Sequence, residues 1–254
     1  MSDIDPETSI STISLSTGQF PISQFSAKDI FLVGYPKSGN AWVQNLVAGL
    51  LYGADPSLAP DSLIQELVPD IHYQRSYKRF SAPMVFKSHH LPRPDFRRVI
   101  YLLRDGRDAV ISELHHSAAL DDKAVEDFDL IKFVDAAAAR WAWHVEAWTR
   151  NAYAAEMMTV KFEDLFANRV EELERVSEFI GVERDSNFLV SLLERASFDR
   201  MREKAGGSNP VALQDKLLWQ RGKVGIYKEE MPASVQQVFL KRAGTVLRNA
   251  GYID

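Results

Sequence analysis

The sequence predicts a single α/β domain in which helices flank a mostly parallel central sheet. Short apolar runs, each followed by turn residues, alternate along the chain with segments of helical spacing, as is typical of parallel sheets. The run at 29–35 is almost continuously apolar, which is expected for a strand buried on both faces. The 254 residues contain no internal repeat and no linker, so we expect one domain over 29–254, preceded by an N-terminal arm over 1–28.

The first half of the chain is expected to contain two strands and two helices. Residues 1–28 are rich in Ser, Thr and Ile without periodicity, which favours an arm. After the strand at 29–35, Trp42, Leu46 and Leu50 recur at helical spacing, and Gly53 is a suitable stop. Residues 55–83 are rich in turn residues and hold one short helix, and 84–92 is a strand with a polar end.

The second half continues the alternation of strands and helices. Residues 97–117 are expected to form a strand, a turn at 104–106 and a helix. An acidic loop follows, and after it we expect a long amphipathic helix at 130–153 and a strand at 156–165. The next elements are a helix stopped by Gly181 and a helical pair at 186–207. The chain is expected to end with a loop at 219–232 and a final helix at 233–249.

Composition excludes several classes of protein. The formal net charge is −5, whereas nucleic-acid binders usually carry a basic excess, so we expect no nucleic-acid partner and only a local anion pocket. The chain has no cysteine, which excludes disulfides and thiolate metal sites and favours a reducing, cytoplasmic location. No apolar run approaches the ~20 residues that span a bilayer, and the N-terminus lacks a signal-peptide pattern. We therefore expect no transmembrane anchor.

The loop between the first strand and helix is a candidate phosphate site. It lies beyond the carboxyl end of a strand and opens a helix, where free backbone N–H groups attract anions. Gly34 and Gly39 have the spacing of the nucleotide-hydrolysing loop G-x-x-x-x-G-K-[ST], but Asn40 and Ala41 replace its Lys and its metal-binding hydroxyl. Lys37 lies inside the loop instead. An ordinary turn is the alternative interpretation, since Pro, Ser, Gly and Asn all favour turns.

A second strand–turn–helix unit, "YLLRDGRDAVIS", places Arg104 at a strand end and Ser112 in the following helix. The guanidinium group of an arginine suits phosphate oxygens. The alternative is a turn held by ion pairs between Arg104, Asp105, Arg107 and Asp108.

A third strand end, "VFKSHHLP", carries Lys87, His89 and His90. Histidine is a suitable general base for an alcohol near neutral pH. Lys87 and His89 point to the same side of a strand and His90 to the other, so we choose His89 as the base.

Together these motifs resemble the sulfotransferases that use 3′-phosphoadenosine 5′-phosphosulfate (PAPS). "YPKSGNAW" resembles the family's Y-P-K-S-G-T-T-W loop, "YLLRDGRDAVIS" its 3′-phosphate motif and "FKSHHLP" its K-[ST]-H-L-P segment. "VKFEDL" is similar to [KR]-Y-E-D-L, "ASFDRM" to T-S-F-x-x-M, and "RGKVGIYK" to the end of R-K-G-x-x-G-D-W-K. The resemblance extends from about Asp29 to Lys228, and all six motifs follow the family's order.

The resemblance implies that the chain is an enzyme that moves a sulfuryl group from PAPS to a hydroxyl or amine acceptor without a metal. The catalytic residues that it implies are His89, Lys37, Lys87 and Ser112. The extra histidine leaves the base open, because counting from Lys87 in the family's segment gives His89 and counting back from its Leu-Pro gives His90; we choose His89. The PAPS-binding residues that it implies are Lys37, Ser38, Gly39, Asn40, Ala41, Trp42, Arg104, Ser112, Phe162, Phe198, Gln220, Arg221 and Gly222.

Several positions depart from the family's motifs. Asn40 and Ala41 replace two threonines, and Phe162 replaces a tyrosine that faces the adenine. Gln220 and Arg221 stand at an Arg-Lys pair, which removes one cation near the 3′-phosphate. Pro232 and Ala233 stand at the Thr-Val of the family's dimer motif, so the oligomeric state stays open.

The sequence leaves two other functions and the acceptor open. A small-molecule kinase and a non-catalytic nucleotide-binding protein are the alternatives. The missing hydroxyl after the loop disfavours the kinase, and the retained lysines and histidine disfavour loss of catalysis. The acceptor is expected to be a small molecule. Aromatic residues suit an apolar or ring-bearing acceptor and equally suit a place in the core, namely Tyr73, Tyr77, Phe80, Phe128 and Trp219.

Overall fold

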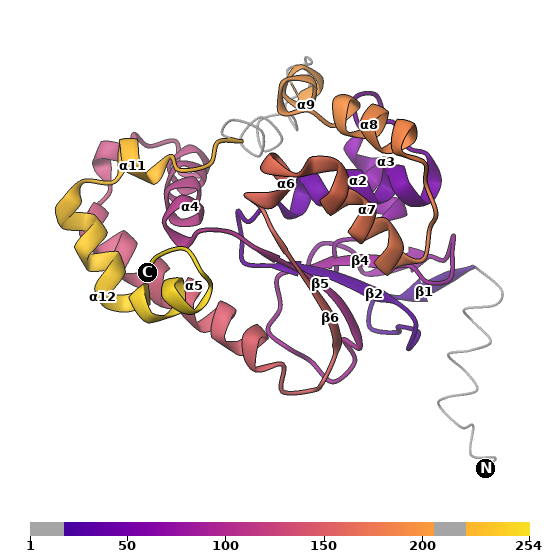
Figure 1. Ribbon diagram of the computed structural model, residues 1–254, viewed down its shortest axis with the longest axis horizontal. Helices are drawn as coiled ribbons and strands as arrows, with labels where there is room; N and C mark the ends of the chain where they lie inside the picture. Colours follow the sequence, from indigo (N-terminus) through magenta and orange to yellow (C-terminus); the bar gives the residue numbers. More distant parts are fainter. Residues whose placement is uncertain (1–17, 206–221) are drawn as a thin grey trace, which may run out of the picture.

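The computed structural model describes residues 18–205 and 222–254. Its centre is a sheet of four parallel strands in the order β4-β2-β5-β6, flanked by helices on both sides (Figure 1). This confirms the predicted α/β class with a parallel sheet. The strands are β2 (Ile30–Gly34), β4 (Val85–Ser88), β5 (Arg98–Leu103) and β6 (Glu156–Lys161).

Alternating side chains of the strands enter two separate cores, one on each face of the sheet. Ile30 and Leu32 of β2 belong to one core, whereas Phe31 and Val33 belong to the other, because successive side chains of a strand point to opposite faces. All five residues of β2 are buried. A continuously apolar run therefore becomes the central strand, as the sequence predicted.

Six helices of the described part of the chain cover the first core (Figure 1). They are α2 (Asn40–Tyr52), α3 (Asp61–Leu67), α6 (Asp164–Ala167), α7 (Arg169–Ile180), α8 (Ser186–Arg195) and α9 (Phe198–Ala205). Gly53 and Gly181 end α2 and α7 in the left-handed conformation, with φ of 68° and 84°. Both predicted helix stops are thus confirmed.

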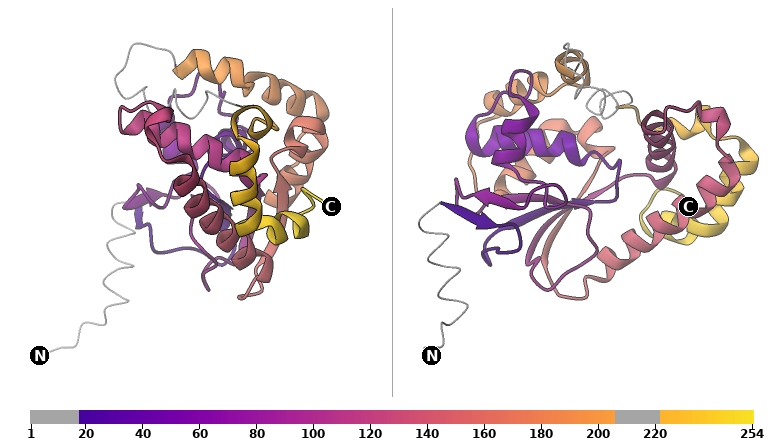
Figure 2. Two further views of the ribbon diagram at one scale, coloured as in Figure 1. Left: turned by 90° about the vertical axis from the view of Figure 1, so that its left-hand side faces the viewer. Right: turned by 180° about the vertical axis from the view of Figure 1, so that it is seen from behind.

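The second core is covered by α4, α5 and α12, which lie together on the other side of the molecule in the views of Figure 2. A 3₁₀ turn, η1 (Val125–Asp127), lies in the predicted acidic loop. The predicted loop at 219–232 contains a short helix, α11, because Asp108 ties its backbone to α4. These helices are α4 (Gly106–Leu120), α5 (Leu130–Arg150), α11 (Tyr227–Glu230) and α12 (Ala233–Asn249).

A small antiparallel ribbon joins the predicted arm to the domain. Its strands are β1 (Gln19–Pro21) and β3 (Ser76–Lys78), and the sequence predicted neither. Phe25 packs with Phe31 and Phe86 in the second core, so the described part of the arm is ordered against the domain. Within the described residues, no helix combines the length and the apolar character that crossing a membrane would require.

Candidate functional site

The predicted site residues gather where the parallel strands end. The turn 35–39 follows β2, His89 follows β4 and Arg104 follows β5, and these three strands are neighbours in the sheet. Ligands of open α/β sheets bind at this carboxyl edge. The fold therefore brings the three motifs together, as their positions at strand ends predicted.

The turn before α2 has an unusual backbone that depends on one glycine. Lys37 and Gly39 have φ of 68° and 95°, in the left-handed region that side-chain-bearing residues rarely adopt. A Cβ atom on Gly39 would lie 2.6 Å from Cδ2 of Phe162, so no other residue fits here. The turn thus lies tightly against β6 and presents Lys37, Ser38 and the start of α2 at the edge of the sheet.

Polar atoms of this turn, of the first residue of α2 and of the residue after β5 are buried without partners among the described residues. They are Nζ of Lys37, Oγ of Ser38, both side-chain polar atoms of Asn40 and Nε of Arg104. Buried polar groups almost always have hydrogen-bond partners, because leaving one unpaired costs about 1–3 kcal/mol. Four neighbouring side chains with spare polar atoms, most of them donors, fit an anionic ligand such as a phosphosulfate.

Lys37 is held in a state that favours an incoming anion. Burial, reinforced by the positive charges of Arg104 and Lys87, lowers the pKa of Lys37 to about 8, while Glu113 opposes the shift. An anion near Nζ would pair with the ammonium group and so oppose this lowering of the pKa.

Arg104 is held by backbone oxygens and not by the neighbouring aspartates. Its guanidinium group donates to the carbonyl oxygens of Lys37 (2.9 Å) and Lys223 (3.0 Å), and lies 4.3 Å from the ring centroid of Phe162. The ion pair that the alternative interpretation expected in this turn forms between Asp105 and Arg107, at 2.6 Å. Among the described residues, Arg104 makes no ion pair, so its charge is available to a ligand.

The C-terminal segment of the site is attached to α4 through Asp108. This fully buried carboxylate accepts the backbone N–H of Gly225 (2.6 Å) and of Tyr227 (3.0 Å). The attachment brings Gly222 and Lys223 beside Arg104. Ser112, one turn further along α4, is half-buried on the same helix.

An aromatic cavity of about 300 Å³ lies beside this segment. Trp42, Phe198 and Gly222 line it, and Nε1 of Trp42 donates to the carbonyl oxygen of Ala196 at 2.8 Å. A Cβ atom on Gly222 would lie 2.4 Å from the ring of Phe198, so the backbone approaches the ring closely. Phe162, by contrast, is 2% exposed beneath Gly39 and does not line the cavity.

His89 is oriented as a proton acceptor. Its Nδ1 lies 2.7 Å from the carbonyl oxygen of Gly34, which can only accept, so Nδ1 carries the proton and Nε2 is free to take one. Burial and the charge of Lys87 lower its pKa to about 4, although the bond to Gly34 and the charge of Asp70 oppose this. The ring is therefore neutral near pH 7.

His90 has a different environment. Its backbone N–H donates to Oγ of Ser88 (3.0 Å), its carbonyl oxygen accepts from the indole of Trp148 (3.0 Å), and its ring lies 4.3 Å from that of His72. No contact to the turn 35–39 holds its ring. Because β4 ends at Ser88, both histidines follow the strand, and the choice of His89 over His90 as the base stays a prediction.

The sequence missed two residues of this region, Asp70 and His72. Asp70 forms an ion pair of 2.9 Å with Lys87, and Nε2 of His72 accepts the backbone N–H of His89 at 2.8 Å. Both lie in the turn-rich segment 55–83, where no periodicity shows which side chains point to the site.

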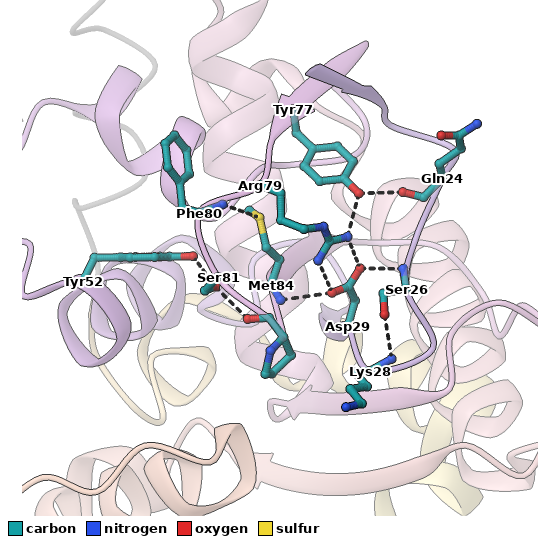
Figure 3. A network of polar contacts seen from close by, with 11 residues as sticks. Gln24, Ser26, Lys28, Asp29, Tyr52, Tyr77, Arg79, Phe80, Ser81 and Met84 are labelled. Carbon is teal, nitrogen blue, oxygen red and sulfur yellow. Dashed lines mark hydrogen bonds and ion pairs between the residues drawn. The ribbon is translucent and has the colours of Figure 1, made fainter. Parts of the chain in front are cut away.

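Two of the predicted aromatic residues lie at the opposite edge of the sheet. Asp29 and Met84, which precede β2 and β4, belong to a network in which Arg79 donates to both oxygens of Asp29 at 2.8 Å (Figure 3). Tyr77 and Phe80 belong to this network and cannot reach His89. Tyr73 is 80% exposed. Gln220, Arg221 and Trp219 lie outside the described residues.

Comparison with known proteins agrees with this site. The profile of the sulfotransferase domain matches residues 27–250. Sulfotransferase 1E1 from Bos taurus is 24% identical over 248 residues, covering 86% of this chain and 83% of its own length. Human sulfotransferase 2B1 is 28% identical over 210 residues, covering 76% of this chain and 57% of its own length.

Solved structures show the same fold. Mouse sulfotransferase SULT7A1, complexed with 3′-phosphoadenosine 5′-phosphate (PAP), superposes with a TM-score of 0.66 at 20% identity, covering 96% of this chain and 91% of its own. Retinol dehydratase, in complex with androsterone and the inactive cofactor PAP, gives 0.65 at 16% identity, covering 89% and 82%. The match of the domain over most of the chain decides the assignment: the chain belongs to the PAPS-dependent sulfotransferase family.

Proposed function

We propose that this sulfotransferase moves the sulfuryl group of PAPS to a hydroxyl, or an amine, of a small-molecule acceptor, by in-line displacement and without a metal. The main support is the group of buried, unpartnered polar atoms at the turn 35–39, which lies next to a histidine with a free Nε2. This arrangement suits an anionic donor and an acceptor that must lose a proton.

The described residues account for both ends of the donor. We assign the phosphosulfate to the turn, through Lys37, Ser38, Asn40 and the backbone N–H groups at the start of α2, where the helix dipole favours an anion. Ala41 would contribute through its backbone alone.

The nucleotide end is assigned to the segment around Gly222. Arg104 and Ser112 would hold the 3′-phosphate, together with Gln220 and Arg221, which stay predictions from the sequence. The adenine would enter the cavity beside the rings of Trp42 and Phe198, which line it and pack together with centroids 5.0 Å apart. Phe162 would support this site from beneath Gly39, because Arg104 covers a face of its ring.

The chemistry follows from the positions of three side chains. When bound, PAPS supplies an activated sulfuryl group whose leaving partner is PAP. Nε2 of His89 would take the proton of the acceptor as the acceptor oxygen forms its bond to sulfur, and the bond from sulfur to the bridging oxygen breaks. Lys37 would neutralise charge that grows on the bridging oxygen, and Lys87 would add positive charge beside the sulfuryl oxygens.

For the acceptor we propose only a chemical class, and for the location only a cellular compartment. The solved retinol dehydratase holds androsterone, a small-molecule alcohol, and we propose a small-molecule acceptor here as well. The half-buried Phe128, which packs edge-on against Phe133, is compatible with an apolar or ring-bearing acceptor.

The cysteine-free composition leads us to propose a cytoplasmic location. We also propose 29–254 as the sulfotransferase domain and 1–28 as the arm.

Transfer of radiolabelled sulfate tests the proposal directly. The protein would be incubated with [³⁵S]PAPS, with EDTA or with Mg²⁺, and with a panel of 4-nitrophenol, a steroid alcohol and a hexosamine. We expect labelled product that does not depend on Mg²⁺. Phosphoryl transfer from [γ-³²P]ATP that requires Mg²⁺ would favour the kinase, and binding of PAP without transfer to any acceptor would favour a non-catalytic protein.

A further inference from the structure

A short turn after α3 runs beside β4, which carries Lys87 and is followed by His89. The backbone N–H of Lys87 donates to the carbonyl oxygen of Pro69 (2.8 Å), and the N–H of Ile71 donates to that of Lys87 (3.0 Å). Asp70 and Lys87 thus form an isolated parallel bridge on the outer side of β4, which is the edge strand of the sheet. The turn extends the sheet by one residue at the point where catalysis is proposed.

Asp70 is the buried counter-charge of Lys87. Its side chain is fully buried and lies 2.9 Å from Nζ of Lys87, and its other oxygen accepts the backbone N–H of His72 at 2.9 Å. A buried charge needs a partner of opposite sign, so each member of this pair fixes the position of the other. The ammonium group of Lys87 is thereby held in one place beside His89.

His72 holds the backbone of the proposed base. Its Nε2 accepts the N–H of His89 at 2.8 Å, so that nitrogen is unprotonated and His72 is neutral in this arrangement. The ring of His89 is held separately by the carbonyl oxygen of Gly34. Two bonds, one to the backbone and one to Nδ1, therefore fix where Nε2 of His89 points.

We infer that Asp70 and His72 are positioning residues for sulfuryl transfer, Asp70 acting through Lys87 and His72 acting through the backbone of His89. This inference rests on the proposed function. The groups that face His89 are Lys87 on β4, Asp70 and His72 on the turn, and His144 on α5, whose ring approaches the His89 backbone.

The role of His72 is tested by two substitutions. His72→Leu removes the acceptor of the His89 N–H, whereas His72→Gln keeps an acceptor oxygen. Tyr73→Phe is the matched control, because Tyr73 lies on the same turn and is 80% exposed. With [³⁵S]PAPS and the best acceptor of the panel, we expect kcat to fall at least about tenfold in His72→Leu and to be largely restored in His72→Gln, with the Kd for PAP unchanged.

A spectroscopic measurement gives the same test without turnover. Long-range ¹H–¹⁵N spectra of the free protein distinguish the two tautomers of histidine, and His89→Gln identifies the signal. We expect the Nδ1–H tautomer in wild type, His72→Gln and Tyr73→Phe, and a mixture of tautomers in His72→Leu. An unchanged His89 signal and an unchanged kcat in His72→Leu would overturn the role of His72. Absence of sulfuryl transfer by the wild type would instead count against the proposed function.

The role of Asp70 is tested by a double-mutant cycle. If Asp70 acts through Lys87, Asp70→Asn and Lys87→Met should each lower kcat at least about tenfold, and the double variant should be no slower than Lys87→Met alone. The double variant also removes both buried charges together, which protects it from the unfolding that an unpaired buried lysine could cause. Losses that multiply in the double variant would show that Asp70 acts independently of Lys87 and would overturn this half of the inference.

Discussion

At the scale of single residues, Lys37 should make PAP binding depend on pH. Its pKa of about 8 in the free protein lies below the ordinary value of 10.5, and a bound anion should raise it again. Binding above pH 8 then takes up part of a proton, so the Kd for PAP should rise a few-fold between pH 7.5 and 9.5. Calorimetry in two buffers of different ionisation enthalpy measures both effects. Lys37→Arg should lose the pH dependence, and a wild-type Kd that is constant over this range would contradict the prediction.

Removing the ammonium group of Lys37 should affect turnover more than binding. The proposed contact to the bridging oxygen strengthens as that oxygen gains charge, and such contacts act on kcat. We expect Lys37→Ala to lower kcat at least about 100-fold, with a much smaller change in the Kd for PAP. Steady-state kinetics and calorimetry on one preparation separate the two effects. A variant that kept kcat and lost affinity would make Lys37 a ground-state binder.

The two adjacent histidines should differ strongly. Only His89 has its Nδ1 fixed by Gly34, so His89→Ala should lower kcat by at least about 100-fold with PAP still bound, and His90→Ala far less. Because its pKa is lowered to about 4, His89 stays unprotonated through the mildly acidic range, and kcat/KM for PAPS should not fall with a midpoint near 6.5. Rates of the wild type and of both variants across pH 5 to 9 check this. If His90→Ala were the inactive variant, His90 would be the base, as counting back from Leu91 and Pro92 suggests.

At the scale of elements, Asp108 should control the selection of the 3′-phosphate. It attaches the segment 222–227 to α4 and so brings the carbonyl oxygen of Lys223 to Arg104. Asp108→Asn loses one charged acceptor, a change worth about 1.5–3 kcal/mol, so the Kd for PAP should rise about tenfold or more. Binding of AMP, which lacks the 3′-phosphate, should change less. Glu229→Gln, an exposed change in the same segment, is the control, and an equal loss for AMP would show general unfolding of the site.

The elements also show what local sequence could and could not predict. Strands β2, β4 and β5 were predictable because each is a short apolar run between turns, and parallel strands place their ends together. Gly53 and Gly181 were predictable because helix ends favour glycine. The bridge from Asp70 to Lys87 was not predictable, because it depends on a contact between a turn-rich segment and a strand from a later part of the chain. The burial of Phe162 beneath Gly39 likewise depends on a contact that no local pattern records.

At the scale of the whole molecule, the two faces of the sheet contribute different parts of the site. The turn 35–39 leads into α2, and residues of α2, α8 and α9 line the aromatic cavity on the side of the first core, whereas Arg104 leads into α4 on the other side. The carboxyl edge is where both cores meet. A ligand that contacts the turn, the cavity and the segment after Gly222 would therefore link both halves of the structure and stabilise the native state as a whole.

That link should make stability depend on the 3′-phosphate. PAP at 100 times its Kd should stabilise the native state by about 2.7 kcal/mol, which for a chain of this size raises Tm by about 5–10 °C. ATP can occupy the turn and the aromatic cavity, but it has no phosphate for Arg104 and Ser112, so its shift should be much smaller. Differential scanning fluorimetry with PAP, ATP and AMP at equal concentrations measures this, and Ser112→Ala should bring the PAP shift closer to that of AMP. Equal shifts with PAP and ATP would contradict the assignment of the 3′-phosphate to Arg104 and Ser112 and would reopen the kinase alternative.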